Sequence, residues 1–326
     1  MSTAINDQST AIKPLLFSSE ENCNTEQVDR FWNHVTEETL TTQDNVSLAY
    51  CYVKHHQSSK AIVISNGRIE AYLKYKELIF DLYQLGYSIY ALDHRGQGLS
   101  SRLSSNPHQG HINSFDDYIN DFEFFIDEIV TPAGHESLFL VGHSMGGTIG
   151  TLYIKKSPST FKAAVFSAPM YGIVLPLYKH FIRWLAKQLD NGSLSHPNYV
   201  IGGKDYAPEA FKHNELTHSE SRYHNYRQIY QELPQLQLGS PTYRWLIEAI
   251  DASERAVIAA RESLIPILIL QAEEDSIVDN DCQNNAASEH CVITKIASAR
   301  HEIFMEKDTP RNHALSLLSQ FLNLHS

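Results

Sequence analysis

The residues of this chain that could most clearly do chemistry form the string Gly-His-Ser-Met-Gly at positions 142–146. An apolar run at 138–141 precedes this string, and a helical pattern follows it. A strand that turns abruptly into a helix needs glycine at Gly142 and Gly146, because larger side chains would collide there. Such a turn lifts the Ser144 hydroxyl clear of the backbone. The pattern predicts that Ser144 is a nucleophile; the plainer alternative is a glycine-rich turn in which the serine caps a helix.

A serine hydroxyl is a weak nucleophile unless a base takes its proton and an acid orients that base. Two later strand patterns, at 266–271 and 291–296, each run into a polar loop that could supply one of these partners. His301 lies between the second strand and the last helix, so we predict that it is the general base and is neutral at working pH. Asp275, after the first strand, is the predicted acid. Three other acidic residues of the same loop are alternatives: Glu273, Glu274 and Asp279.

Acyl transfer also requires two N–H donors for the negative charge that develops on the carbonyl oxygen. The backbone N–H of Met145, directly after Ser144, is the first predicted donor of this oxyanion hole. The second is the backbone N–H of Arg68, in the loop after the strand pattern at 61–65. Only the backbone of Arg68 is needed for this, so its side chain is left for a salt bridge or for contact with a substrate phosphate.

Two further polar features are interpreted as structural. The charged, glycine-containing loop at 93–100 can turn sharply at the sheet edge, where Asp93 and Arg95 would tie neighbouring loops together. His143 is expected to pack beside the turn, because its neighbour Ser144 already takes the exposed position. No His-Glu-x-x-His or Cys-x-x-Cys string occurs, so the sequence gives little support for a metal site or a redox-active cysteine pair.

The composition limits the classes of function. A net charge of −12 argues against binding to nucleic acid and against a purely electrostatic attraction to anionic membranes. No apolar run reaches the ~20 residues needed to cross a bilayer. The polar segment at 1–24 lacks the basic and then apolar pattern of a signal peptide, so we expect a cytoplasmic protein.

Strand and helix patterns alternate through the first half of the chain. Strands are expected at 37–41, 46–53, 61–65, 88–92, 138–141 and 163–167, and helices at 74–85, 115–130 and 144–156. This alternation predicts an α/β fold, with a mainly parallel sheet covered by helices on both faces. A strand at 266–271, a strand at 291–296 and a helix at 310–324 complete it.

Between these halves the alternation stops, and aromatic helical patterns occur at 178–189, 208–211, 219–231 and 241–259. We interpret this segment as an inserted helical cap. The expected organisation is therefore a polar lead-in at 1–30, a first part of the core at 31–167, the cap at 168–264 and a second part of the core at 265–326.

The pattern at 178–189 is amphipathic and gives weak evidence about the substrate. Its apolar residues fall on one face of a helix, and its basic residues fall on the opposite side. One interpretation is a helix packed on the core with a solvated basic side. The other is a lid that offers apolar surface to an acyl chain or rests on a membrane. Three further aromatic residues could line an apolar slot: Trp184, Tyr243 and Trp245.

Together these residues resemble the serine α/β-hydrolases of the monoacylglycerol-lipase-like branch, and most of all its bacterial lysophospholipases. The likeness spans residues 31–324. It includes Asp-His-Arg-Gly-Gln-Gly at 93–98, the string at 142–147 and the late His301, with further matches at 67–75, 216–219 and 239–243. One departure is Asn66-Gly67, where many relatives carry His-Gly.

The resemblance implies an α/β-hydrolase fold, a triad of Ser144, Asp275 and His301, and no cofactor. It also implies hydrolysis of the fatty-acyl ester of a lysophospholipid or another single-chain lipid. Peripheral membrane contact through the cap, on the inner face of the membrane, is an expectation from the amphipathic pattern at 178–189. Monoacylglycerol lipase and short-chain carboxylesterase are alternative activities. A non-catalytic hydrolase-like binding protein is a remote alternative, because all three triad positions are filled.

Overall fold

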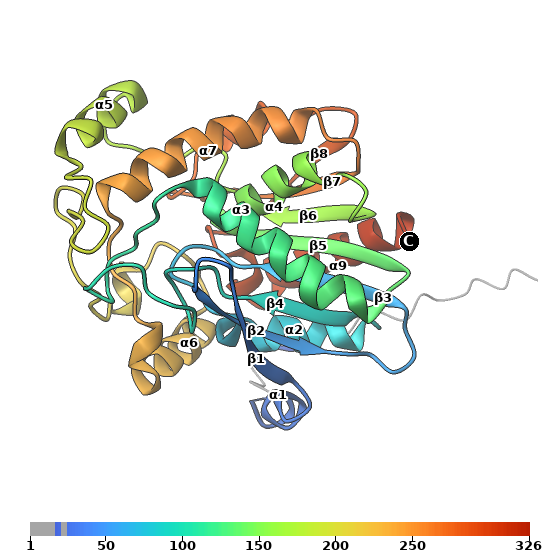
Figure 1. Ribbon diagram of the computed structural model, residues 1–326. Coiled ribbons are helices and arrows are strands. Elements are labelled where there is room, and N and C mark those ends of the chain that lie inside the picture. Colours follow the sequence, from blue (N-terminus) through green and yellow to red (C-terminus); the bar gives the residue numbers. More distant parts are fainter. Residues whose placement is uncertain (1–16, 21–24) are drawn as a thin grey trace, which may run out of the picture.

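The computed structural model describes residues 17–20 and 25–326, so the lead-in expected at 1–30 lies largely outside the described residues. The described residues form a sheet in the order β1-β2-β4-β3-β5-β6-β7-β8 (Figure 1). Its strands are β1 (Thr36–Thr41), β2 (Ser47–Val53), β3 (Lys60–Ser65), β4 (Ser88–Leu92), β5 (Ser137–His143), β6 (Ala163–Ser167), β7 (Ile267–Ala272) and β8 (Cys291–Ile296). β2 runs antiparallel to both of its neighbours, and all other pairs are parallel.

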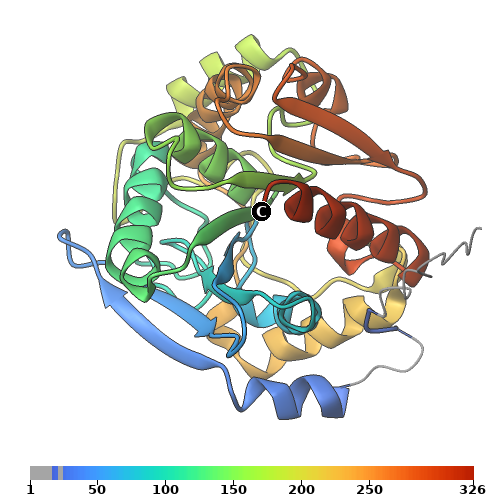
Figure 2. The same cartoon turned by 90° about the vertical axis from the view of Figure 1, so that its right-hand side faces the viewer.

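The central strands are continuous apolar runs because they are covered on both faces. Every residue of β4 and β6 is buried, and so is every residue of β7. Figure 2 shows α2 (Lys76–Gln84) and α9 (Asp308–Leu324) on one side of the sheet and α3 (Phe115–Phe125) and α4 (Met145–Lys156) on the other. The expected mainly parallel, doubly covered sheet is therefore confirmed.

The remaining helices are α1 (Thr25–Trp32), α5 (Lys179–Leu189), α6 (Glu220–Glu232), α7 (Tyr243–Arg261) and α8 (Asn280–Asn284). α1 spans residue 30, so a helix runs through the boundary expected there between lead-in and core. α5, α6 and α7 lie in the segment between β6 and β7 that was interpreted as the cap. The helix expected at 208–211 does not form; only a short 3-10 turn is present, at Phe211–His213.

The loop after β4 ties several parts of the core together, as the sequence indicated. The buried carboxylate of Asp93 accepts hydrogen bonds from the backbone N–H groups of Tyr72 and Leu99, at 2.6 and 2.8 Å. Arg95 forms ion pairs with Asp121 in α3 and with Asp44 in the β1–β2 turn. These contacts hold the loop rigidly at the edge of the sheet where the site lies.

In the cap, α5 has the reverse orientation to the one expected for a helix packed on the core. Its basic residues Lys179 and Arg183 form ion pairs with Glu254 and Asp251 of α7, each at 2.6 Å. Among the residues of α5, only Ala186 is fully buried, against α7. The apolar face is turned outward: Tyr178, Phe181 and Trp184 are 89, 49 and 56% exposed. The basic side therefore stays partly solvated, as expected, but two of its cations also contact α7.

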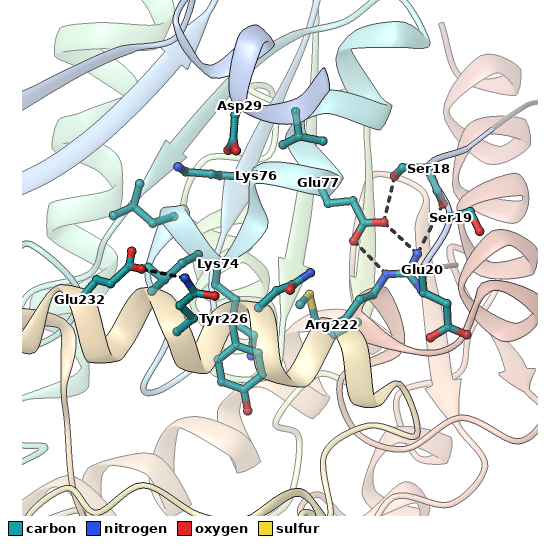
Figure 3. Close-up of a pocket in the computed structure, with 16 residues that line it drawn as sticks. Ser18, Ser19, Glu20, Asp29, Lys74, Lys76, Glu77, Arg222, Tyr226 and Glu232 are labelled. Atoms are coloured by element: carbon teal, nitrogen blue, oxygen red, sulfur yellow. Dashed lines mark hydrogen bonds and ion pairs between the residues drawn. The ribbon is translucent and has the colours of Figure 1, made fainter. Parts of the chain in front are cut away.

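The cap is anchored to the core through Arg222 of α6 (Figure 3). The Arg222 guanidinium is buried and donates at 2.8 Å to Glu77 of α2 and to Asp308 at the start of α9. A cavity of about 380 Å³ lies beside these groups, lined by α6, α2 and residues 18–20. Ser144 does not line it, so this cavity is separate from the predicted nucleophile.

The burial of His94, in the loop after β4, leads to a prediction about how the free energy of unfolding depends on pH. His94 is fully buried, its Nε2 lies 2.9 Å from the Ser65 hydroxyl, and burial lowers its pKa to about 3. Below the ordinary pKa of about 6.5, the unfolded chain therefore binds a proton that the folded chain does not. The free energy of unfolding should fall as pH drops from about 6.5 to about 3, with this histidine contributing up to ~1.4 kcal/mol per pH unit.

The substitution His94→Gln should make this slope shallower, because the amide does not titrate. Urea unfolding between pH 4 and 7 measures the slope. His34→Gln, at an exposed position, should leave it unchanged. Equal slopes for wild type and His94→Gln would contradict the assignment.

Candidate active site

The turn between β5 and α4 has the strained geometry that the sequence predicted. Ser144 has φ 50° and ψ −117°, in the left-handed region that non-glycine residues rarely adopt. Its backbone N–H donates to Ser167, and its carbonyl accepts from Met170, each at 3.0 Å. The turn also brings α4 against the end of β3: a Cβ on Gly146 would lie 2.0 Å from the carbonyl oxygen of Ser65. Glycine is therefore required at this position.

The structure brings Ser144, His301 and Asp275 into one chain of hydrogen bonds. The Ser144 Oγ lies 2.9 Å from Nε2 of His301, and Nδ1 of His301 lies 2.8 Å from Oδ2 of Asp275. The three side chains come from the ends of β5, β8 and β7, which meet at one edge of the sheet. Because Ser144 and His301 are both largely buried, little water competes for these contacts.

Asp275 is held as an ionised acceptor. Burial raises the pKa of this carboxyl, but the hydrogen bond and charge of His301 and the backbone N–H groups of Ile277 and Val278 lower it more. Those two N–H groups donate to Oδ1 at 2.9 and 3.0 Å. A carboxylate facing Nδ1 keeps the proton on that nitrogen, so Nε2 is left to accept the proton of Ser144.

The alternative acids of this loop are engaged elsewhere. Glu273 accepts from the backbone of Ser298, and Glu274 lies 3.3 Å from His218. Asp279 caps the short helix α8. Of these four, Asp275 is the one that contacts His301, in agreement with the prediction, and the three alternatives are set aside.

The two predicted oxyanion donors lie on either side of Ser144. Met145 is the first residue of α4, and Arg68 is in the loop after β3. Within the described residues, the backbone hydrogen bonds of loops, turns and helix ends include none that is donated by the N–H of Met145 or of Arg68. Both donors therefore remain free for a substrate oxygen.

Side chains hold the loop that carries Arg68 in place. The amide of Gln97 donates to the carbonyl groups of Gly67 and Glu70 at 2.7 and 3.0 Å, and Asn66 donates to Asp93 at 3.0 Å. Asn66, the departure from the usual His-Gly, thus serves to join this loop to the one after β4. Sequence reasoning identified the loop at 93–100 as structural but missed that Gln97 supports the oxyanion loop.

A buried ion-pair network lies beneath the site and helps to position it. The sequence analysis did not identify this network. Lys74 contacts Glu70 at 2.8 Å and Glu302 at 2.5 Å. Burial raises the pKa of Glu70, but the nearby charge of Lys74 and the hydrogen bonds from Lys74 and Tyr75 together outweigh it and lower the pKa to about 2. Glu70 also accepts from the Gly67 N–H, and Glu302 directly follows His301. One lysine therefore links the oxyanion loop to the loop of the histidine.

His143 packs beside the turn as expected. Its ring centroid lies 4.8 Å from that of His301, and its Nδ1 lies 3.2 Å from the Ser167 carbonyl oxygen. Burial lowers the pKa of His143 to about 4, so this ring stays neutral beside the site. It supports the His301 ring without sharing in the hydrogen-bond chain.

Ser144 and His301 open into a cavity of about 500 Å³ between core and cap. Much of its wall is apolar, from residues that include Met170, Ile173, Leu216, Leu238, Ile277 and Val278. Of the three aromatic residues expected to line a slot, Trp245 does so. Trp184 is exposed on the outside of the cap instead, and Tyr243 packs against Ala186.

The Arg68 side chain also lines this cavity, but it forms no salt bridge with the described residues. Its Nη2 donates to the carbonyl oxygen of Gly239 at 2.6 Å, and its guanidinium lies 5.0 Å from the centre of the Trp245 ring. The sequence analysis left a salt bridge or a substrate phosphate as the use of this side chain, and the prediction of a salt bridge is therefore wrong. Among the described residues there is also no cluster of side chains suited to holding a metal.

Residues 56–308 match the family described as serine aminopeptidase, S33, and the chain belongs to that family. It is similar to lysophospholipase L2 of Escherichia coli strain K12, with 37% identity over 309 residues that cover 91% of this chain and 90% of the relative. It is also 34% identical to a probable lysophospholipase L2 of Haemophilus influenzae, over 91% of this chain and 95% of that one.

Among solved structures, a soluble variant of monoglyceride lipase from Saccharomyces cerevisiae in complex with a substrate analog aligns with a TM-score of 0.67. It covers 89% of this chain and 97% of its own, at 18% identity, which establishes a shared fold. The predicted α/β-hydrolase fold and the resemblance to the monoacylglycerol-lipase-like branch are confirmed. No helix in residues 17–20 and 25–326 has the length and apolar character needed to span a bilayer.

The turn at Ser144 yields a prediction about folding. Gly146→Ala places a methyl group against the Ser65 backbone, which cannot move without disturbing β3. The expected cost is at least ~3 kcal/mol of unfolding free energy. Gly134→Ala is the control, because this glycine has a φ of 72° but open space around it, and its expected cost is ~1 kcal/mol. Chemical denaturation measures both, and a smaller loss for Gly146→Ala would contradict the packing argument.

Proposed function

We propose that this protein is a serine hydrolase that cleaves the fatty-acyl ester of lysophospholipids. The observation that carries the proposal is the hydrogen-bonded chain of Ser144, His301 and Asp275 at the base of a cavity with a largely apolar wall. The likeness to two relatives named lysophospholipase L2, each aligned over 91% of this chain, supports the choice of substrate.

In the first half-reaction, Nε2 of His301 takes the proton of Ser144 while Oγ attacks the ester carbonyl carbon. The charge that develops on the carbonyl oxygen is stabilised by the N–H groups of Met145 and Arg68; losing one such donor typically costs ~3 kcal/mol of barrier. The imidazolium of His301, stabilised by the Asp275 carboxylate, then gives its proton to the leaving glycerol oxygen. The acyl group remains bound to Ser144 as an ester.

In the second half-reaction, water enters at the position that the glycerol oxygen has left. His301 takes a proton from this water, and the resulting hydroxide attacks the acyl carbon. Collapse of the intermediate returns the proton to the Ser144 oxygen and releases a fatty acid. No metal or other cofactor has a role in these steps.

The apolar wall favours long acyl chains over short ones, because each buried methylene contributes ~0.8 kcal/mol to binding. Monoacylglycerols carry the same chain and ester, so their hydrolysis is the second candidate activity. The outward apolar face of α5 leads us to propose further that the cap rests on a lipid surface, at the inner face of the membrane in the cytoplasm. The ion pairs with α7 support this, since they hold Lys179 and Arg183 on the opposite side of α5 and leave the apolar face outward.

The catalytic proposal predicts that Ser144→Ala hydrolyses lysophosphatidylethanolamine at least ~1000-fold more slowly than wild type, because the nucleophile is absent. Release of fatty acid is measured for this lipid and for a monoacylglycerol, release of p-nitrophenol for a short p-nitrophenyl ester, and release of p-nitroaniline for an aminoacyl p-nitroanilide. Ser105→Ala, at an exposed position, should behave as wild type.

Full activity of Ser144→Ala would contradict the mechanism. A wild type that cleaves only the short ester or the anilide would contradict the lipid assignment and would favour a carboxylesterase or an aminopeptidase.

The membrane proposal predicts that the double variant Phe181→Ser, Trp184→Ser binds vesicles at least ~10-fold more weakly, because two half-exposed rings lose their apolar contact with lipid. Co-sedimentation with phosphatidylethanolamine and phosphatidylglycerol vesicles measures this. Leu324→Ser removes an exposed apolar side chain from α9 and should bind as wild type. Equal binding of all three proteins would rule out α5 as the contact.

A further inference from the structure

Arg68 offers the site a second polar group besides its backbone N–H, the guanidinium of its side chain. Its backbone N–H is a predicted donor to the reacting carbonyl oxygen, and its guanidinium lines the same cavity as Ser144. Gly110 leaves room for this guanidinium, since a Cβ there would lie 2.4 Å from Nη2 of Arg68. The chain therefore accommodates a large cation beside the ester-cleaving serine.

This cation lacks an anionic partner among the described residues. Its contacts are the Gly239 carbonyl oxygen and the face of Trp245, while Nε is buried with no hydrogen-bond partner. Burial lowers the pKa of Arg68 to about 10. Placing a guanidinium in such surroundings is costly unless an anion compensates it. The cost points to an anion supplied by the ligand.

A second unpaired cation lies on the cap side of the cavity. Arg227 of α6 lies over the rings of Tyr206, Tyr223 and Tyr226, at 5.0 to 5.9 Å, and forms no ion pair with a described carboxylate. Its Nε is likewise buried without a partner. Two exposed carboxylates line the rim of the cavity, but neither forms an ion pair with Arg68 or Arg227: Asp205 and Glu209.

We propose that the guanidinium of Arg68 binds the phosphate of a lysophospholipid headgroup, with Arg227 facing the same group from the cap. In such a lipid, the link from the ester carbonyl to the phosphorus runs through the ester oxygen, the glycerol carbons and the phosphate ester oxygen, and it is about as long as an arginine side chain. One residue can thus stabilise the reacting ester through its backbone and hold the headgroup through its side chain, by charge-assisted hydrogen bonds to phosphate oxygens. This inference rests on the proposed function and adds the group that distinguishes lysophospholipid from monoacylglycerol.

The test compares two substrates with the same acyl chain, lysophosphatidylethanolamine and monoacylglycerol. The ratio of their kcat/KM values isolates the phosphate, because any damage to the oxyanion loop slows both. Arg68→Gln should lower this ratio at least ~10-fold, while Arg68→Lys, which keeps the charge, should retain more of it. Arg255→Gln removes a half-exposed arginine that pairs with Asp116 outside the cavity, and it should leave the ratio unchanged.

An unchanged ratio in Arg68→Gln overturns the phosphate assignment while leaving the proposed function intact. A wild type that does not hydrolyse lysophospholipids overturns both.

A second measurement uses only the wild-type protein, so it tests the phosphate site even if the Arg68 variants fold poorly. Glycerophosphoethanolamine should inhibit monoacylglycerol hydrolysis competitively and more strongly than glycerol does. It should also inhibit more strongly than inorganic phosphate at matched ionic strength. Inhibition no stronger than that by glycerol overturns the phosphate site. Equal inhibition by inorganic phosphate overturns the assignment to a lipid headgroup, since the site then recognises any phosphate anion.

Discussion

The sharp turn at Ser144 is the constraint on which the rest of the site depends. A non-glycine residue in this backbone conformation is strained by ~1–3 kcal/mol, and the strain persists only because neighbouring structure holds it. Here the Ser144 N–H and carbonyl are fixed by Ser167 and Met170, at the end of β6 and just beyond it. The same turn sets the direction of the hydroxyl, the start of α4 and the position of the Met145 N–H. Three elements of the mechanism therefore follow from one backbone conformation.

The partners of this turn are held by polar contacts that cross the sheet edge. Lys74 joins Glu70 in the oxyanion loop to Glu302 beside the triad histidine, and Gln97 supports the oxyanion loop from the loop after β4. Removing one member of a buried charge pair is costly, because the remaining charge keeps its desolvation penalty. The network thus couples the stability of the core to the placement of catalytic groups. The cap adds part of the cavity wall and the outward apolar face of α5.

Local patterns predicted the parts of the molecule that are determined locally. The buried strands, the turn at Ser144 and the helices of the core follow from apolar periodicity and from glycine placement, and the structure bears them out. The resemblance to known hydrolases fixed the chain order of nucleophile, acid and base. Asp275 was the predicted acid, but its three acidic neighbours could be set aside only in three dimensions, because the choice depends on which carboxylate reaches His301.

Other features depended on contacts between distant residues. The partners of the Arg68 side chain are Gly239 and Trp245, which come from a cap segment more than 170 residues later in the chain, so the sequence did not reveal them. The sequence showed the amphipathic pattern of α5 but not which side of this helix faces the rest of the cap. The ion pairs with Glu254 and Asp251 place its basic side toward α7. The support given by Gln97 to the oxyanion loop likewise needs the adjacency of β3 and β4.

The central claim is that His301 activates Ser144, and reaction with a fluorophosphonate probe tests it most directly. Mass spectrometry of the labelled wild type should show one adduct, on the peptide that contains Ser144. The labelling rate should fall at least ~100-fold in His301→Gln, because nothing then removes the hydroxyl proton. An adduct on a different residue, or labelling of His301→Gln as fast as that of the wild type, would contradict this account.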